Sequence, residues 1–200
     1  MDPTQPSALQ TLVRDTTGMA ASDTTDPDPP VHSAEQIETI SAVELQERLR
    51  EEISRAARHG TPLACLLVTV GNLEELSRVH GSDLSERTLA YVGSALRRQL
   101  RDFDRIGRPS EGELFVILPG ADGPHAEAVA RRVLVRLRTI KIEADGRRRP
   151  LRVSVGLAAW RAGVSDQELL AQTRAAATRA AGLEPPAGGA TVSPPALGRP

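Results

Sequence analysis

The apolar run Leu63–Val70, interrupted only by Thr69, constrains the fold more than any other feature of this 200-residue chain. A run of this length without a polar face is typical of a central strand that is covered on both of its faces. The chain is 40% hydrophobic, which is enough to build such a core. The run therefore predicts a layered α/β domain in which helices cover a sheet.

Hydrophobic periodicity predicts the helices around this strand. Apolar residues recur at three- and four-residue spacing over residues 44–58, 73–79, 82–100, 125–138 and 166–181. Gly60 is expected to end the first of these helices, because glycine readily adopts the left-handed conformation that closes a helix.

The remaining strands are predicted as two hairpins. The first joins residues 105–108 to residues 113–118, and the second joins residues 140–144 to residues 151–158 through Asp145 and Gly146, with solvated arginines 147–149 at its tip. This order of elements predicts an α/β (α+β) sandwich whose central, mainly antiparallel sheet is flanked by helices.

Both ends of the chain differ in composition from its middle. Residues 1–33 are rich in Asp, Thr and Pro, and residues 183–200 are rich in Pro, Gly and Ala. Such segments cannot bury enough apolar surface to offset the entropy lost on ordering. We therefore expect two disordered tails and one domain over residues 34–182.

Charge and cysteine content narrow the classes of partner and compartment. The formal net charge of -1 disfavours a protein that grips nucleic acid or anionic membrane over its whole surface. Cys65 is the single cysteine, forms no internal disulfide and lies in the apolar run, so it is expected to be buried and inert. With no long apolar segment and no apolar leader, the chain is expected to be cytoplasmic, with neither nucleic acid nor membrane as partner.

Residues 101–119 resemble the central hairpin of the GGDEF (diguanylate cyclase) domain. In this resemblance Ser110-Glu111-Gly112-Glu113-Leu114 stands in place of Gly-Gly-Asp/Glu-Glu-Phe, so the signature is degenerate. Residues 80–86, residues 153–156 and the end of the last helix at Gly182 are similar to further family segments in the same order. The resemblance implies a GGDEF, nucleotide-cyclase-like sandwich.

The resemblance also locates the positions that hold metal, triphosphate and guanine in the family. At these positions the chain has other residues, namely Thr69, Gly71, Glu74, Ser77, Glu86 and Gly112. A slip of one residue would place Glu113 at the third signature position, which still leaves a single carboxylate. We therefore predict a non-enzyme with no catalytic residues, no metal and no cofactor. None of the four histidines has a Cys or acid at metal-ligand spacing.

A second family site matches better. It consists of Arg-x-x-Asp, ending five residues before the signature, and an arginine on the following helix. These correspond to Arg101, Asp104 and Arg132. Arginine forks bind phosphate and the Hoogsteen edge of guanine, while a carboxylate accepts the guanine N–H groups. The resemblance thus implies a cyclic di-GMP receptor or adaptor that acts through an unidentified signalling protein, with the ligand either bridging two protomers or fixing a partner-binding face.

Two other interpretations stay open. In the first, the domain is a nucleotide-independent interaction scaffold. The charges of Arg101, Asp104 and Arg132 are then ordinary solvated charges in an arginine-rich chain. A cryptic GTP-binding or GTP-hydrolysing domain is disfavoured by Thr69, Gly71 and Glu74. Glu74 in particular would repel phosphates.

Overall fold

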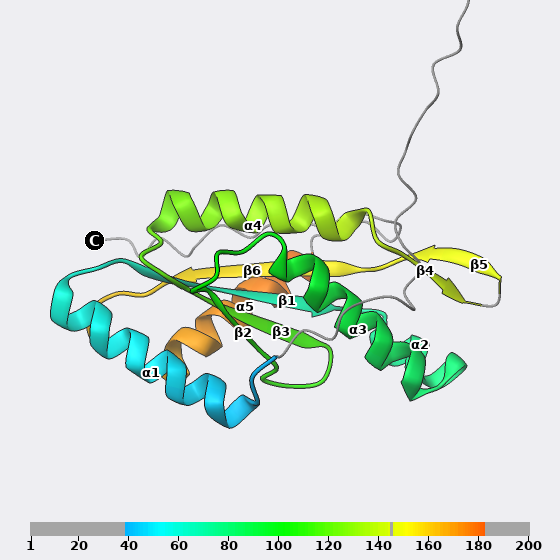
Figure 1. Cartoon of the computed structure of the whole chain (residues 1–200), viewed down its shortest axis with the longest axis horizontal. Coiled ribbons are helices and arrows are strands. Elements are labelled where there is room, and N and C mark those ends of the chain that lie inside the picture. The colour runs from blue at the N-terminus through cyan, green and yellow to red at the C-terminus, as the bar shows by residue number, and fades with distance from the viewer. Residues whose placement is uncertain (1–38, 145, 183–200) are drawn as a thin grey trace, which may run out of the picture.

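A four-stranded antiparallel sheet lies between two layers of helices (Figure 1). The structure is a computed structural model and describes residues 39–144 and 146–182, so the tails expected over residues 1–33 and 183–200 lie outside the described residues. The strand order is β2-β3-β1-β6. The strands are β1 (Leu63–Val70), β2 (Arg105–Gly107), β3 (Glu113–Pro119) and β6 (Val153–Ala159). The predicted fold class is confirmed.

Strand β1 occupies the interior of the sheet, as its composition predicts. It pairs with β3 on one side and with β6 on the other, so that Leu66 faces Val116 and Leu157 in the two neighbouring strands. Its side chains alternate between the two cores above and below the sheet. Cys65 is fully buried in one of them, and burial raises the pKa of its thiol.

Two helices cover each face of the sheet (Figure 1). Helices α3 (Ser82–Arg97) and α4 (Gly123–Arg138) cover one face, with α2 (Leu73–His80) beside α3, and α1 (Ala42–His59) and α5 (Asp166–Gly182) cover the other. Gly60 closes α1 in the left-handed conformation, as predicted. No helix in the described part of the chain is long and apolar enough to cross a membrane.

Gly156 sets the distance between α5 and the sheet. A Cβ atom at this position would lie 2.3 Å from the backbone oxygen of Thr173 and 2.3 Å from the backbone nitrogen of Ala177. Because both atoms belong to the α5 backbone, only glycine permits this helix to lie so close to β6.

The prediction of the second hairpin is wrong about its second strand, predicted over residues 151–158. Strand β4 (Lys141–Ala144) pairs with β5 (Arg147–Pro150) in a separate ribbon, and Ala144 lies opposite Arg147. Arginines 147–149 therefore form a strand instead of a hairpin tip. The physical reason is that residues 153–158 are buried, which a two-stranded ribbon cannot provide, and these residues join the central sheet as β6.

Candidate functional site

The loop between α3 and β2 carries Arg101 and Asp104. Asp104 is only 4% exposed, and its Oδ2 accepts a hydrogen bond from the backbone N–H of Arg101 at 2.8 Å. The backbone N–H of Asp104 donates in turn to the Arg101 carbonyl at 3.1 Å, which closes the turn. Burial raises the pKa of the Asp104 carboxyl, although this hydrogen bond acts in the opposite direction.

Neighbouring arginines fix the backbone of the same loop. Arg97 donates from Nη1 to the Asp104 carbonyl at 2.8 Å and from Nη2 to the Arg101 carbonyl. Arg105 donates from Nη1 to the Asp102 carbonyl at 3.0 Å. Side-chain donors therefore satisfy three carbonyls within four residues and hold the loop in one conformation.

The predicted third residue, Arg132, reaches this loop from α4. Its Nη2 donates to the carbonyl of Gln99 at 2.5 Å, two residues before Arg101. The Arg101 guanidinium lies over the Phe103 ring, with Cζ 5.7 Å from the ring centroid. Arg101 and Arg132 are both exposed. The structure thus brings the three predicted residues to one loop. Asp104 and Arg101 belong to the loop and contact each other, and Arg132 reaches it by its bond to Gln99.

Residues 110–114, which stand at the place of the family signature, lie at the other end of the β2–β3 hairpin. Gly112 adopts the left-handed conformation (φ 72°), and its carbonyl accepts from the backbone N–H of Val70 at 3.1 Å. Arg174 of α5 binds the Glu113 carboxylate with two hydrogen bonds, Nε to Oε1 at 3.1 Å and Nη2 to Oε2 at 2.7 Å. The Ser110 hydroxyl contacts this carboxylate as well. Burial alone would raise the pKa of Glu113, but these hydrogen bonds outweigh it and lower that pKa.

Thr69 lies beside Glu113 across the strands. It is opposite Glu113 in β3 and opposite Ser154 in β6. The hydroxyls of Thr69 and Ser154 are 2.5 Å apart and hydrogen-bonded to each other. Within residues 39–144 and 146–182, no group of three or more His, Cys, Asp or Glu side chains could hold a metal ion.

The other predicted nucleotide positions lie on α2 and α3. Glu86 forms a bidentate ion pair with Arg108, with Nη1–Oε2 and Nη2–Oε1 distances of 2.9 and 3.1 Å, and this pair lowers the pKa of Glu86. The Glu86–Arg108 ion pair lines a pocket of about 280 Å³ between α3 and the β2–β3 hairpin. Glu74 is exposed in the first turn of α2, and Ser77 is half-buried in the same helix.

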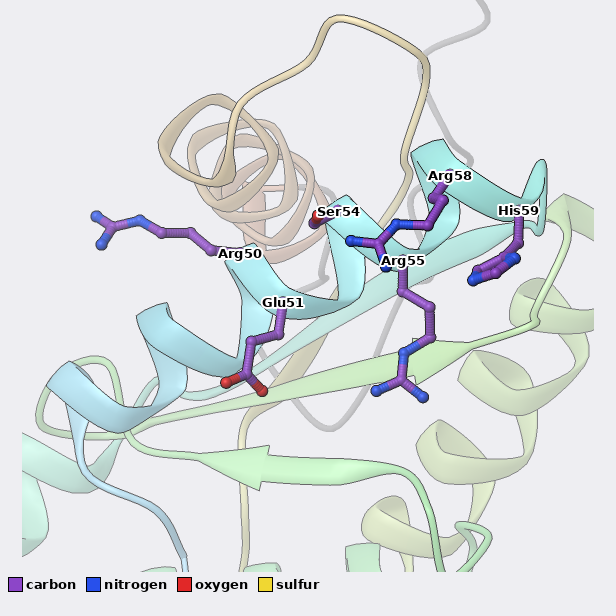
Figure 2. Close-up of a pocket in the computed structure, with 6 residues that line it drawn as sticks. All are labelled: Arg50, Glu51, Ser54, Arg55, Arg58 and His59. Carbon is purple, nitrogen blue, oxygen red and sulfur yellow. The ribbon is translucent and has the colours of Figure 1, made fainter.

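A further groove, of about 570 Å³, follows the outer surface of α1. Figure 2 shows its charged lining, in which the guanidinium groups of Arg50, Arg55 and Arg58 point to separate parts of the surface. Arg50 is bonded to Asp166 at the start of α5 at 3.0 Å. Since the cations do not converge on one point, the groove has no focused site for an anion.

Sequence reasoning missed the arginines that engage the acidic side chains. Arg174 and Arg108 bind Glu113 and Glu86, yet neither stands in a recognisable motif. Arg174 and Glu113 are 61 residues apart in the sequence. In a chain this rich in arginine, only the fold identifies such pairs.

Comparisons with known proteins agree with this architecture. The family model for the diguanylate cyclase GGDEF domain matches residues 42–182. Diguanylate cyclase DosC of Escherichia coli K12 is 29% identical over 124 residues, which cover 62% of this chain and 27% of DosC. The chain spans 35% or less of the length of each curated relative that it matches.

Solved structures show the same fold. Diguanylate cyclase SiaD of Pseudomonas aeruginosa, solved in complex with its activator SiaC, has a TM-score of 0.67 and 25% identity over 74% of this chain and 59% of SiaD. The GGDEF domain of DgcB from Caulobacter crescentus, solved in complex with c-di-GMP, has a TM-score of 0.71 and 15% identity over 80% of this chain and 93% of that domain. With its family model matched from α1 to α5, the chain belongs to the GGDEF-domain family.

Proposed function

We propose that this chain is a degenerate, catalytically inactive GGDEF domain that works as a cyclic di-GMP receptor or adaptor. The ligand binds at Arg101, Asp104 and Arg132, and the signal passes to another protein. The domain extends over residues 34–182 and acts in the cytoplasm.

The donor atoms at the signature edge support the inactive state. Magnesium ions are bound by carboxylate and phosphate oxygens in a strict octahedral geometry. Here the two hydroxyls of Thr69 and Ser154 are bonded to each other, and the Glu113 carboxylate is bonded to Arg174. This donor set does not fit a catalytic pair of divalent cations.

The triphosphate and base positions support the same conclusion. The exposed carboxylate of Glu74 would repel a triphosphate. Glu86, the carboxylate at the family positions that read guanine, accepts hydrogen bonds from both Nη1 and Nη2 of Arg108. A GTP molecule would have to break this pair before its base could be read.

The receptor function is supported by one observation above all. Two exposed arginines lie beside a loop whose conformation is already fixed by hydrogen bonds. Arg101 and Arg132 lie at a backbone fixed by Arg97 and Asp104. A loop held in one conformation loses little entropy when a ligand binds. Guanidinium forks suit both the phosphates and the guanine edge of a cyclic dinucleotide.

A nucleotide-independent scaffold is the second candidate, and the same loop favours it in another way. Asp104 is 4% exposed and already caps the Arg101 N–H, while Arg132 already binds the Gln99 carbonyl. These contacts give both residues a structural role without any ligand. In the solved complex of SiaD, a family member binds a protein activator.

Calorimetric titration of cyclic di-GMP into the purified chain distinguishes the two functions. We expect micromolar or tighter binding that is lost in Arg101→Ala and kept in Arg147→Ala, a matched change of an exposed arginine on β5. A folded protein that takes up no cyclic di-GMP would contradict the receptor and favour the scaffold. Assays with GTP and Mg²⁺ should give no cyclic di-GMP, and product formation would contradict the inactive assignment.

A further inference from the structure

Phe103 is the aromatic side chain that this chain leaves at its surface. The sequence contains two Phe, one Tyr and one Trp. Phe115 is fully buried and Tyr91 is 7% exposed, while Trp160 is half-buried and donates its indole N–H to the Val164 carbonyl at 2.9 Å. Phe103, by contrast, is 50% exposed. Of the four aromatic side chains, Phe103 is thus the most exposed.

The backbone on both sides of Phe103 is held by hydrogen bonds. Arg105 binds the carbonyl of Asp102, and Arg97 binds the carbonyl of Asp104. The Asp104 carboxylate binds the Arg101 N–H across the turn. The ring is therefore presented from a fixed position, next to the carboxylate and the guanidinium of the proposed site.

The ring already interacts with one member of that site. The Arg101 guanidinium lies over it at 5.7 Å from the centroid, within the range of a cation–π contact. This contact orients the guanidinium while leaving its N–H groups for an acceptor. The exposed half of the ring remains available for a second contact.

We propose, resting on the proposed function, that Phe103 is a stacking contact for a purine base of the bound cyclic dinucleotide. The base lies against the exposed part of the ring, the Asp104 carboxylate accepts from N–H groups on the edge of the base, and Arg101 binds that edge or the adjoining phosphate. Aromatic side chains are regular stacking partners of unpaired bases, and larger rings stack more strongly. Phe103 thereby contacts the face of the base, whereas Arg101, Asp104 and Arg132 contact its edge and the charged phosphates. Because purines have the larger rings, this contact favours purine over pyrimidine dinucleotides.

Affinity measurements on two replacements test this role. Phe103→Leu keeps an apolar side chain without a π face and is expected to weaken cyclic di-GMP binding about tenfold. Phe103→Tyr is expected to retain the affinity of the unaltered chain. Val79→Ala, a change at a 57% exposed apolar residue on α2, is the matched control and should bind normally.

A fluorescence readout separates contact with the base from an indirect effect through Arg101. In Phe103→Trp, cyclic di-GMP should quench the new indole, whereas Trp160 in the unaltered chain gives the baseline signal. Binding by the unaltered chain with equal affinity in Phe103→Leu and no quenching in Phe103→Trp would overturn the stacking role and leave the receptor intact. Lack of binding by the unaltered chain would overturn the receptor, and the stacking role with it.

Discussion

Arg174 of α5 holds the carboxylate of Glu113 at the start of β3 through two hydrogen bonds. The Glu113 side chain is 15% exposed and the Arg174 side chain is 44% exposed. The pair joins α5 to the start of β3, within the segment that stands at the place of the family signature. It occupies one of the two carboxylates in residues 110–114, the other being that of Glu111.

Removing the arginine of this pair should destabilise the domain. Arg174→Ala leaves a largely buried carboxylate with only the Ser110 hydroxyl as side-chain donor, and we expect a loss of about 1–2 kcal/mol in the free energy of unfolding. Urea denaturation measures this loss. Arg179→Ala, at an exposed position on the same helix, is the control and should change stability by less than about 0.5 kcal/mol. Equal effects of the two changes would contradict a stabilising role for the pair.

The same pair predicts how stability depends on pH. The pKa of Glu113 is lower in the folded protein than its usual 4.5, so its contribution is fully present above that value. This stability is lost as the pH falls through the lowered pKa of the folded state. Denaturation midpoints measured from pH 7 to pH 3 should fall more steeply for the unaltered chain than for Arg174→Ala. Parallel curves would show that Glu113 does not carry this dependence.

Asp104 should contribute with the opposite sign. Burial raises the pKa of its carboxyl, so the folded state binds a proton more readily and gains stability from this residue as the pH falls through that raised pKa. Asp104→Asn keeps an oxygen for the Arg101 N–H and removes the buried charge. We expect it to change the free energy of unfolding little at pH 7. Asp104→Ala removes the acceptor and should cost about 1–3 kcal/mol. Thermal unfolding of both variants checks this order, and a reversed order would refute it.

Gly156 provides a test of packing between β6 and α5. Gly156→Ala places a methyl group within 2.3 Å of the helix backbone, and we expect a loss of about 3 kcal/mol because a backbone atom cannot rotate away. Gly123→Ala on α4 is the control, since a Cβ there meets nothing within 4 Å. Calorimetric unfolding compares the two. A mild effect at Gly156 would mean that α5 can shift outward at low cost.

Ligands should stabilise the chain selectively. Cyclic di-GMP binds only the folded state under our proposal and should raise the melting temperature with concentration. GTP with Mg²⁺ should leave the melting temperature unchanged, because Glu74 and the Thr69–Ser154 pair offer no place for a triphosphate and its metal. Thermal shift assays measure both, and a GTP-dependent rise would require a different nucleotide site.

The central strand could be predicted from the sequence, and the ribbon could not. The composition of residues 63–70 leaves few alternatives to a strand inside a sheet, and the structure places it there. The pairing of β4 depends on whether residues 147–150 continue as a strand, and three arginines carry no hydrophobic signal for this. At the candidate site the resemblance to the family predicts Arg101, Asp104 and Arg132 as ligand contacts, and this stays a prediction. The contacts of Arg97, Arg108 and Arg174 arise from tertiary proximity.

The β4–β5 ribbon has a consequence for how copies of this chain meet in solution. All four residues of β5 are exposed, and arginines 147–149 place like charges along it. A free strand edge invites pairing with the edge of another molecule, which is the first step of aggregation. Two ribbons approaching each other would bring six guanidinium groups together. Their mutual repulsion disfavours pairing at this edge, so we expect any association between protomers to proceed through another surface.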